Sequence, residues 1–150
     1  RTCVRSLTVL EREEDNWCVV VGGGVGSMML RSIEVDDVTG NLAKEPLIDG
    51  VRCQELQPPH DDRVVSLATR SGGFLISGAL DGTLRVWDCS PTKTGTGTTQ
   101  PTCLYRLYGY KVWLSSICTD DTKIISDGSD NRIVVHDFSC SQDQQKDDAD

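Results

Sequence analysis

The amino-acid sequence predicts an all-β fold built from repeated antiparallel units. Residues 60–88 and residues 110–137 align with each other, and Asp81 matches Asp130 at a spacing of 49 residues. Both copies consist of short runs of β-favouring residues separated by glycine and polar residues. Neither copy keeps a helical period over a window of about 12 residues. The repeat and its residue pattern together indicate strands rather than helices.

The middle copy contains the clearest hairpin. In FLISGALDGTLRVWD, two β-rich runs flank Asp81-Gly82, a dipeptide that suits a tight two-residue turn. Leu84 and Val86 alternate with more polar neighbours, as expected for a strand whose two faces differ. The strands predicted for this copy are 64–69, 74–78, 83–89 and 103–108.

The first and last copies follow the same plan with weaker similarity. VRSLTV resembles VVSLAT of the middle copy, CVVVGG resembles FLISG, and MLRSIEV lies over TLRVWDC. The strands predicted for the first copy are 4–9, 18–23, 29–35 and 51–56. Those predicted for the last copy are 113–118, 123–127 and 132–138, with no fourth strand because the acidic sequence DQQKDDAD follows.

The glycine-rich stretch WCVVVGGGVGSMML has two interpretations. As part of the first copy, residues 18–35 form a β-hairpin that turns between Gly22 and Ser27. As the phosphate loop of a nucleotide-dependent oxidoreductase, Gly22, Gly24 and Ser27 would instead lead directly into a helix. A helical stripe after Ser27 is only half apolar, so the hairpin is favoured. The secondary structure of residues 28–38 distinguishes the two.

The middle copy resembles a repeat of the WD-repeat (WD40) family. It has His60, then SGALD at 77–81 and then Trp87-Asp88, and the last copy has Tyr110, SDGSD at 126–130 and His136-Asp137. The resemblance implies a partial β-propeller of about three four-stranded antiparallel blades, the last incomplete. The blades are expected at about 1–56, 57–108 and 109–139, followed by a disordered acidic tail at 140–150. Since propellers close with typically four to eight blades, further blades from a longer chain are expected.

Three residues of the middle copy could be mistaken for a catalytic triad. His60, Ser77 and Asp81 contain the residue types of a hydrolase triad, but the chain has no G-x-S-x-G sequence. In WD repeats the matching positions resemble a buried hydrogen-bond network that runs through His60, Asp81, Ser77 and Trp87. We therefore expect a structural network and no catalytic residues.

Composition argues against several other classes of function. The net charge of −8 is unlike a nucleic-acid-binding domain, which normally presents a basic face to phosphates. The seven cysteines include no C-x-x-C pair and only two histidines accompany them, so no metal site is predicted. No apolar run approaches the roughly 18 residues of a membrane span. We expect no cofactor, and a location in the cytoplasm, the nucleus or both.

The resemblance implies a non-catalytic scaffold that binds proteins or peptides, as in ubiquitin-ligase substrate receptors or signalling adaptors. Partners of such propellers often bind the face that carries the loops before each first strand and the tight turns. The residues expected there are Arg63, Leu80, Lys111 and Ser129, with Asp61 and Asp62 beside them. Arg63 and Lys111 would suit an acidic or phosphorylated peptide, although the two aspartates partly cancel that field.

Overall fold

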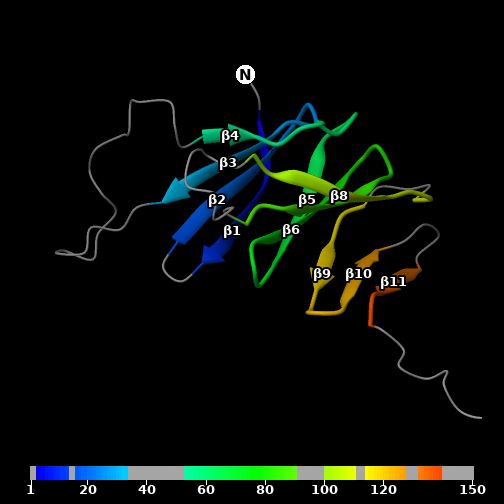
Figure 1. Ribbon diagram of the computed structural model, residues 1–150. Coiled ribbons are helices and arrows are strands. Elements are labelled where there is room, and N and C mark those ends of the chain that lie inside the picture. Colours follow the sequence, from blue (N-terminus) through cyan, green and yellow to red (C-terminus); the bar gives the residue numbers. More distant parts are fainter. Residues whose placement is uncertain are drawn as a thin grey trace, which may run out of the picture.

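The described part of the chain consists of three antiparallel β-sheets arranged one after another (Figure 1). The computed structural model describes residues 3–13, 16–33, 53–90, 100–110, 114–127 and 132–139. Every regular element within these residues is a strand, so the predicted all-β fold is confirmed. The sheets have the form of propeller blades that do not close into a ring. The predicted acidic tail, residues 140–150, lies outside the described residues.

The first sheet, called blade one, holds four strands in sequential order. Its strands are β1 (Val4–Glu13), β2 (Asn16–Gly23), β3 (Met28–Ile33) and β4 (Cys53–Glu55). Each strand pairs antiparallel with the next, so the chain moves outward from β1 to β4. Each of the four predicted strands of the first copy overlaps one of these.

Blades two and three repeat this order. Blade two consists of β5 (Val64–Arg70), β6 (Phe74–Ala79), β7 (Leu84–Asp88) and β8 (Thr102–Leu107). Blade three consists of β9 (Ile117–Thr119), β10 (Lys123–Asp127) and β11 (Ile133–Asp137). The described part of blade three has three strands, as the sequence predicted.

The glycine-rich stretch is the hairpin between β2 and β3. Gly22 pairs with Met28, and the intervening turn contains Gly26 with a φ of 82°, a left-handed conformation that favours glycine. Met28–Ile33 is a strand that pairs on both sides, with β2 and with β4. A phosphate loop requires a helix at this place, so the dinucleotide interpretation is wrong.

Two apolar layers join the three blades. The first layer packs Leu10, Val20 and Leu30 of blade one against Leu75 and Trp87 of blade two. The second layer contains Ile76, Leu84 and Val86 of blade two together with Leu114, Ile117 and Ile124 of the next repeat. Because Leu75 and Ile76 are neighbours on β6, their side chains point to opposite faces, one into each layer. Blade two is thus covered on both faces, which explains the continuous apolar run of β6.

The outer faces of the two end blades remain exposed. On blade one, Leu7 is 62% exposed, because it lies on the face opposite the layer shared with blade two. On blade three, Ile133 is 76% exposed for the same reason. These faces have the residue types of the covered faces without a neighbour against them.

The tight turns of blades one and two also contact the loop that opens the next repeat. The His60 N–H donates to the Gly26 carbonyl at 3.0 Å, and a Cβ added at Gly26 would collide with the His60 carbonyl oxygen. In the same way, a Cβ added at Gly82, where φ is 73°, would collide with the carbonyl oxygen of Tyr110. The two glycines therefore allow the backbones of consecutive repeats to approach closely.

Candidate functional site

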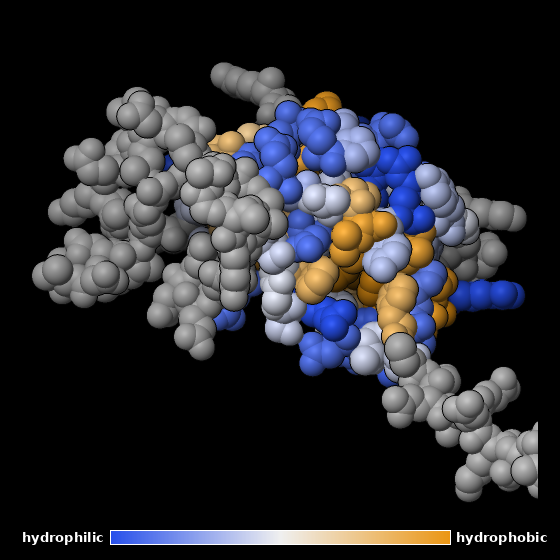
Figure 2. All heavy atoms as spheres, in the orientation of Figure 1, coloured by the Kyte–Doolittle hydropathy of each residue, from blue (hydrophilic) through white to orange (hydrophobic). Residues whose placement is uncertain are grey.

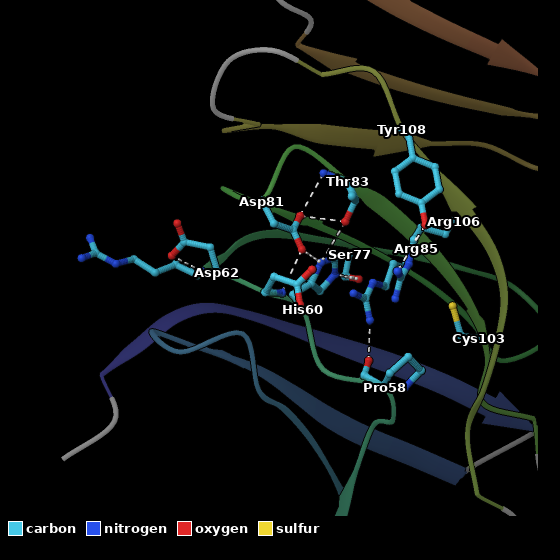
Figure 3. Close-up of polar contacts among 12 residues, drawn as sticks. Pro58, His60, Asp62, Ser77, Asp81, Thr83, Arg85, Cys103, Arg106 and Tyr108 are labelled. Atoms are coloured by element: carbon cyan, nitrogen blue, oxygen red, sulfur yellow. Dashed lines mark hydrogen bonds and ion pairs between the residues drawn. The ribbon is translucent and has the colours of Figure 1, made fainter.

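The four residues of the predicted network meet at one end of blade two. Figure 3 labels three of them, His60, Ser77 and Asp81. His60 lies in the loop before β5, Ser77 lies within β6, and Trp87 lies within β7. Asp81 occupies the turn between β6 and β7. The β6–β7 hairpin therefore brings three of them together, and the His60 loop folds over that hairpin.

The hydrogen bonds form one continuous chain. Trp87 Nε1–H donates to Ser77 Oγ at 2.9 Å, and Ser77 Oγ lies 2.8 Å from His60 Nε2. His60 Nδ1 lies 2.9 Å from Asp81 Oδ2. An indole N–H can only donate, so Ser77 accepts from Trp87. The Asp81 carboxylate can only accept, so the proton that lies between it and His60 is on Nδ1. In a neutral imidazole Nε2 then carries no proton and accepts from the Ser77 hydroxyl.

Asp81 is held as a carboxylate by several donors. Burial alone would raise its pKa, but hydrogen bonds from the Thr83 hydroxyl, the Asp61 N–H and His60 outweigh burial and lower it. The Thr83 hydroxyl donates to Oδ1 at 2.7 Å, and the Asp61 N–H donates to Oδ2 at 3.0 Å. One carboxylate thus ties the turn to the loop before β5.

His60 is held in its neutral form. Burial lowers the pKa of His60 below 6.5, against the opposing attraction of Asp81. In the neutral form Nδ1–H donates to Asp81 while Nε2 accepts from the Ser77 hydroxyl. The imidazole therefore acts here as a fixed bridge between a hydroxyl and a carboxylate.

This depressed pKa predicts a loss of stability in mild acid. The unfolded chain binds a proton at His60 with a pKa near 6.5, whereas the folded chain resists protonation until lower pH. The stabilising contribution is complete above about pH 6.5 and declines as the pH falls toward the folded-state pKa. Urea unfolding measures the free energy of unfolding at about pH 7.5 and about pH 5.5. Between these two pH values this free energy should decrease more for the natural protein than for His60→Gln. Equal decreases would mean that His60 titrates with the same pKa in both states.

Ser77 is placed for structure and not for attack on a substrate. Its side chain has no exposed surface, and both of its neighbours in the network are buried. A nucleophile must reach the substrate, whereas this hydroxyl is hydrogen-bonded to Trp87 and His60. The arrangement can hold the hairpin and the loop in one rigid unit.

Blade three carries a related network with two residue types exchanged. Tyr110 stands where His60 stands, and its hydroxyl lies 2.6 Å from His136 Nε2. Ser126 matches Ser77, and its hydroxyl donates to the Tyr110 oxygen at 3.2 Å. His136 takes the place of Trp87. The sequence showed both substitutions separately but not that the two new side chains bond to each other.

Blade one lacks these polar groups. Its register places Gly22 opposite Met28 as Gly78 is opposite Leu84, so Val21 and Val25 correspond to Ser77 and Asp81. Val25 is 66% exposed and has no polar atom beyond the backbone. Blade one therefore keeps the turn glycine while lacking the acid that ties its turn to a loop.

The predicted partner-binding residues lie beside the network of blade two. Arg63 is exposed, and its carbonyl accepts from the Leu80 N–H at 2.9 Å, so these two candidates are adjacent. Asp61 and Asp62 are exposed next to them, and Asp62 Oδ1 accepts from the Arg63 N–H at 2.7 Å. Lys111 and Ser129, the candidates from the following repeat, lie outside the described residues.

The part of the chain that contains these four residues matches a known family of repeats. Residues 51–88, which contain His60, Ser77, Asp81 and Trp87, match the family model described as "WD domain, G-beta repeat". Residues 51–88 are therefore a WD repeat. This WD-repeat chain is also similar to the ribosome biogenesis protein ytm1 of Emericella nidulans, with 34% identity over 96 residues. The match covers 51% of this chain and 20% of the relative, so the chain spans about a fifth of the length of the curated protein that it matches.

The described ranges of this WD-repeat chain contain neither a candidate metal site nor a candidate membrane-spanning helix. No group of three or more His, Cys, Asp or Glu residues there could hold a metal ion. The described residues also contain no helix long and apolar enough to cross a membrane.

One polar cluster in the WD repeat was not predicted from the sequence. Arg85 of β7 lies directly opposite Arg106 of β8, and Arg85 is fully buried (Figure 3). Pairing across β7 and β8 shifts at a bulge between Val86 and Trp87, so the residues that face each other cannot be read by counting. In the sequence, only the presence of Arg85 and Arg106 in two consecutive predicted strands could have indicated this pair.

Proposed function

We propose that this WD-repeat chain is part of a non-catalytic scaffold that binds other proteins or peptides and helps to assemble a multiprotein complex. The observation that carries the proposal is the rim formed by the loop before β5 and the β6–β7 turn. Asp81 joins the two through His60 and the Asp61 N–H, and the Leu80 N–H bonds the Arg63 carbonyl. Exposed groups on a rigid support lose little conformational freedom on binding.

The partner-binding surface that we propose comprises Arg63, Leu80, Lys111 and Ser129. Arg63 offers a bidentate donor for a carboxylate or phosphate, and Leu80 offers an apolar contact beside it. Asp61 and Asp62 would favour partners whose acidic group reaches Arg63 alone. An acidic or phosphorylated peptide is therefore the proposed ligand class.

The similarity to a ribosome biogenesis protein supports a role in complex assembly. We propose assembly of a ribosome-related complex as one form of the function, and a ubiquitin-ligase substrate receptor or signalling adaptor as others that the family resemblance allows. A location in the nucleus, the cytoplasm or both suits each of them.

We further propose that additional blades complete the ring, with the present blades at about 1–56, 57–108 and 109–139. The exposed apolar faces of blades one and three support this, because each resembles a face that is covered between consecutive blades. An acidic tail at 140–150 belongs to the same proposal.

A photo-crosslinking amino acid placed at Leu80 of the full-length protein tests the proposed surface. We expect it to capture partner proteins in cells, and we expect Arg63→Glu to reduce that capture, because the charge reversal repels an acidic ligand. The matched control is the crosslinker at Glu11, an exposed residue of β1 at the opposite end of the blades. Capture from position 11 alone would place the binding surface at the opposite end of the blades, and capture from neither position would contradict protein binding at either end.

A further inference from the structure

The outer edge of blade two has the features of a second binding surface. β8 is the last strand of its sheet, and its free side carries only an isolated bridge from Thr102 to Gln57 within the described residues. Three large apolar or aromatic side chains of this edge are exposed, namely Leu104, Tyr105 and Tyr108. Hydrophobic side chains gather between β8 and blade three (Figure 2). An unpaired strand edge can hydrogen-bond to an extended segment of another chain.

A cavity of about 270 Å³ opens beside this edge, between blades two and three. Its apolar lining includes Phe74, Ile76, Val86, Leu104, Tyr105 and Phe138. Tyr105 and Phe138 stack with their ring centres 6.4 Å apart.

The cations at the margin of this cavity already face carboxylates. Arg70 Nε lies 3.7 Å from Asp121 Oδ1, and Lys123 Nζ lies 3.7 Å from Asp137 Oδ2. An acidic ligand group would have to compete with these aspartates. The cavity is therefore suited to an uncharged apolar side chain.

On the face of the sheet opposite the cavity, β7 and β8 each carry an arginine, Arg85 and Arg106. Arg85 and Arg106 are directly opposite each other on neighbouring strands, an arrangement that is destabilising when no anion is present. Arg85 is buried, its Nη1 donates to the Pro58 carbonyl at 2.5 Å, and its Nε has no hydrogen-bond partner. Arg106 is exposed and donates to the Tyr108 hydroxyl at 3.2 Å.

No carboxylate of the described chain forms an ion pair with either guanidinium. Asp61 and Asp81 attract them only from a longer distance. Burial, and next the charge of Arg106, lower the pKa of Arg85. Both effects disfavour the charged form of Arg85 in the folded chain. A carboxylate bound at Arg106 would offset this repulsion at the surface.

The alternation of β8 places these two features on opposite sides of the strand. Tyr105 pairs with Val86 and faces the cavity, while Arg106 pairs with Arg85 and faces blade one. We propose that the free edge of β8 binds an extended acidic peptide segment by strand addition. One apolar side chain of the segment fills the cavity beside Tyr105, and the adjacent acidic side chain pairs with Arg106. This surface is separate from the Arg63–Leu80 rim and goes beyond the proposed function.

A blocked octapeptide of threonines with Leu-Glu at its centre is a direct probe. Added to the isotope-labelled protein, it should shift the backbone amide signals of Cys103 to Tyr108. Changing the peptide's Glu to Gln should weaken binding roughly tenfold, because the bond to a charged donor is lost. Arg106→Gln should weaken binding of the Glu peptide by a similar factor. The Gln peptide should bind Arg106→Gln only slightly more weakly than either single change allows, because both changes remove the same interaction. Changing the peptide's Leu to Ala should weaken binding independently.

Arg5→Gln, at an exposed arginine of β1, is the matched control and should leave the affinity unchanged. A melting temperature of Arg106→Gln at or above that of the natural protein would show that the variant is folded, because the substitution removes the repulsion between Arg106 and Arg85. The proposal is overturned if the peptide fails to bind, if the shifted signals lie away from β8, or if the Glu and Gln peptides bind equally. Any of these results would leave crosslinking from Leu80 unaffected, so the two surfaces are tested separately.

Discussion

Trp87→Ala should lower the free energy of unfolding by about 3–5 kcal/mol, the range for truncating a large buried aromatic side chain. Trp87 has no exposed surface and packs in the layer between blades one and two. The substitution leaves a cavity in that layer and removes the indole donor to Ser77. The effect combines lost apolar contact with a weakened network around His60.

Urea unfolding followed by circular dichroism measures this loss without relying on tryptophan fluorescence. Trp17→Ala is the matched control, because Trp17 is 37% exposed and lies on the open face of blade one. We expect a much smaller loss for Trp17→Ala. Similar losses for the two variants would show that the layer between blades one and two does not dominate stability.

Gly26→Ala should also destabilise strongly, by about 3 kcal/mol, because it combines backbone strain with a collision. Gly26 has a φ of 82°, and its added Cβ would overlap the backbone carbonyl of His60. A backbone carbonyl cannot rotate away as a flexible side chain could, so the two repeats would have to separate.

Gly72→Ala isolates the strain from the collision. Gly72 has nearly the same φ, 80°, but its added Cβ would meet only the Phe74 ring at ordinary contact distance. The strain alone should cost about 1–2 kcal/mol. If thermal unfolding showed Gly26→Ala to be no worse than Gly72→Ala, close approach between the repeats would not contribute to stability.

The strands could be predicted because their signals are local. Asp81-Gly82 marks a hairpin by its own conformational preferences, and the 49-residue repeat carries the same plan to the last blade. The Gly22–Ser27 stretch was harder, since glycines suit both a hairpin and a phosphate loop. The residues after it align with a predicted strand of the middle copy, which favoured the hairpin. The structure confirms this strand from Met28 to Ile33.

The polar groupings could be predicted only in part. His60, Ser77, Asp81 and Trp87 were grouped from the family pattern alone, since the distances between them depend on how the loop folds over the hairpin. The bond between Tyr110 and His136 joins residues from the loop and from β11, and no sequence pattern specified it. The arginine pair of β7 and β8 depends on a bulge whose position is set by three-dimensional packing.

The contact between Gly26 and His60 affects where the protein can be divided. His60 opens the second repeat in sequence, yet its N–H bonds to the turn of blade one and its ring bonds to the turn of blade two. Leu56 likewise bonds to Met28 and is buried in the layer shared by both blades. A recombinant fragment cut between residues 56 and 57 would separate the two halves of this joint. A fragment meant to keep blade two folded should therefore begin before β1. It then includes the turn of blade one that the His60 loop contacts.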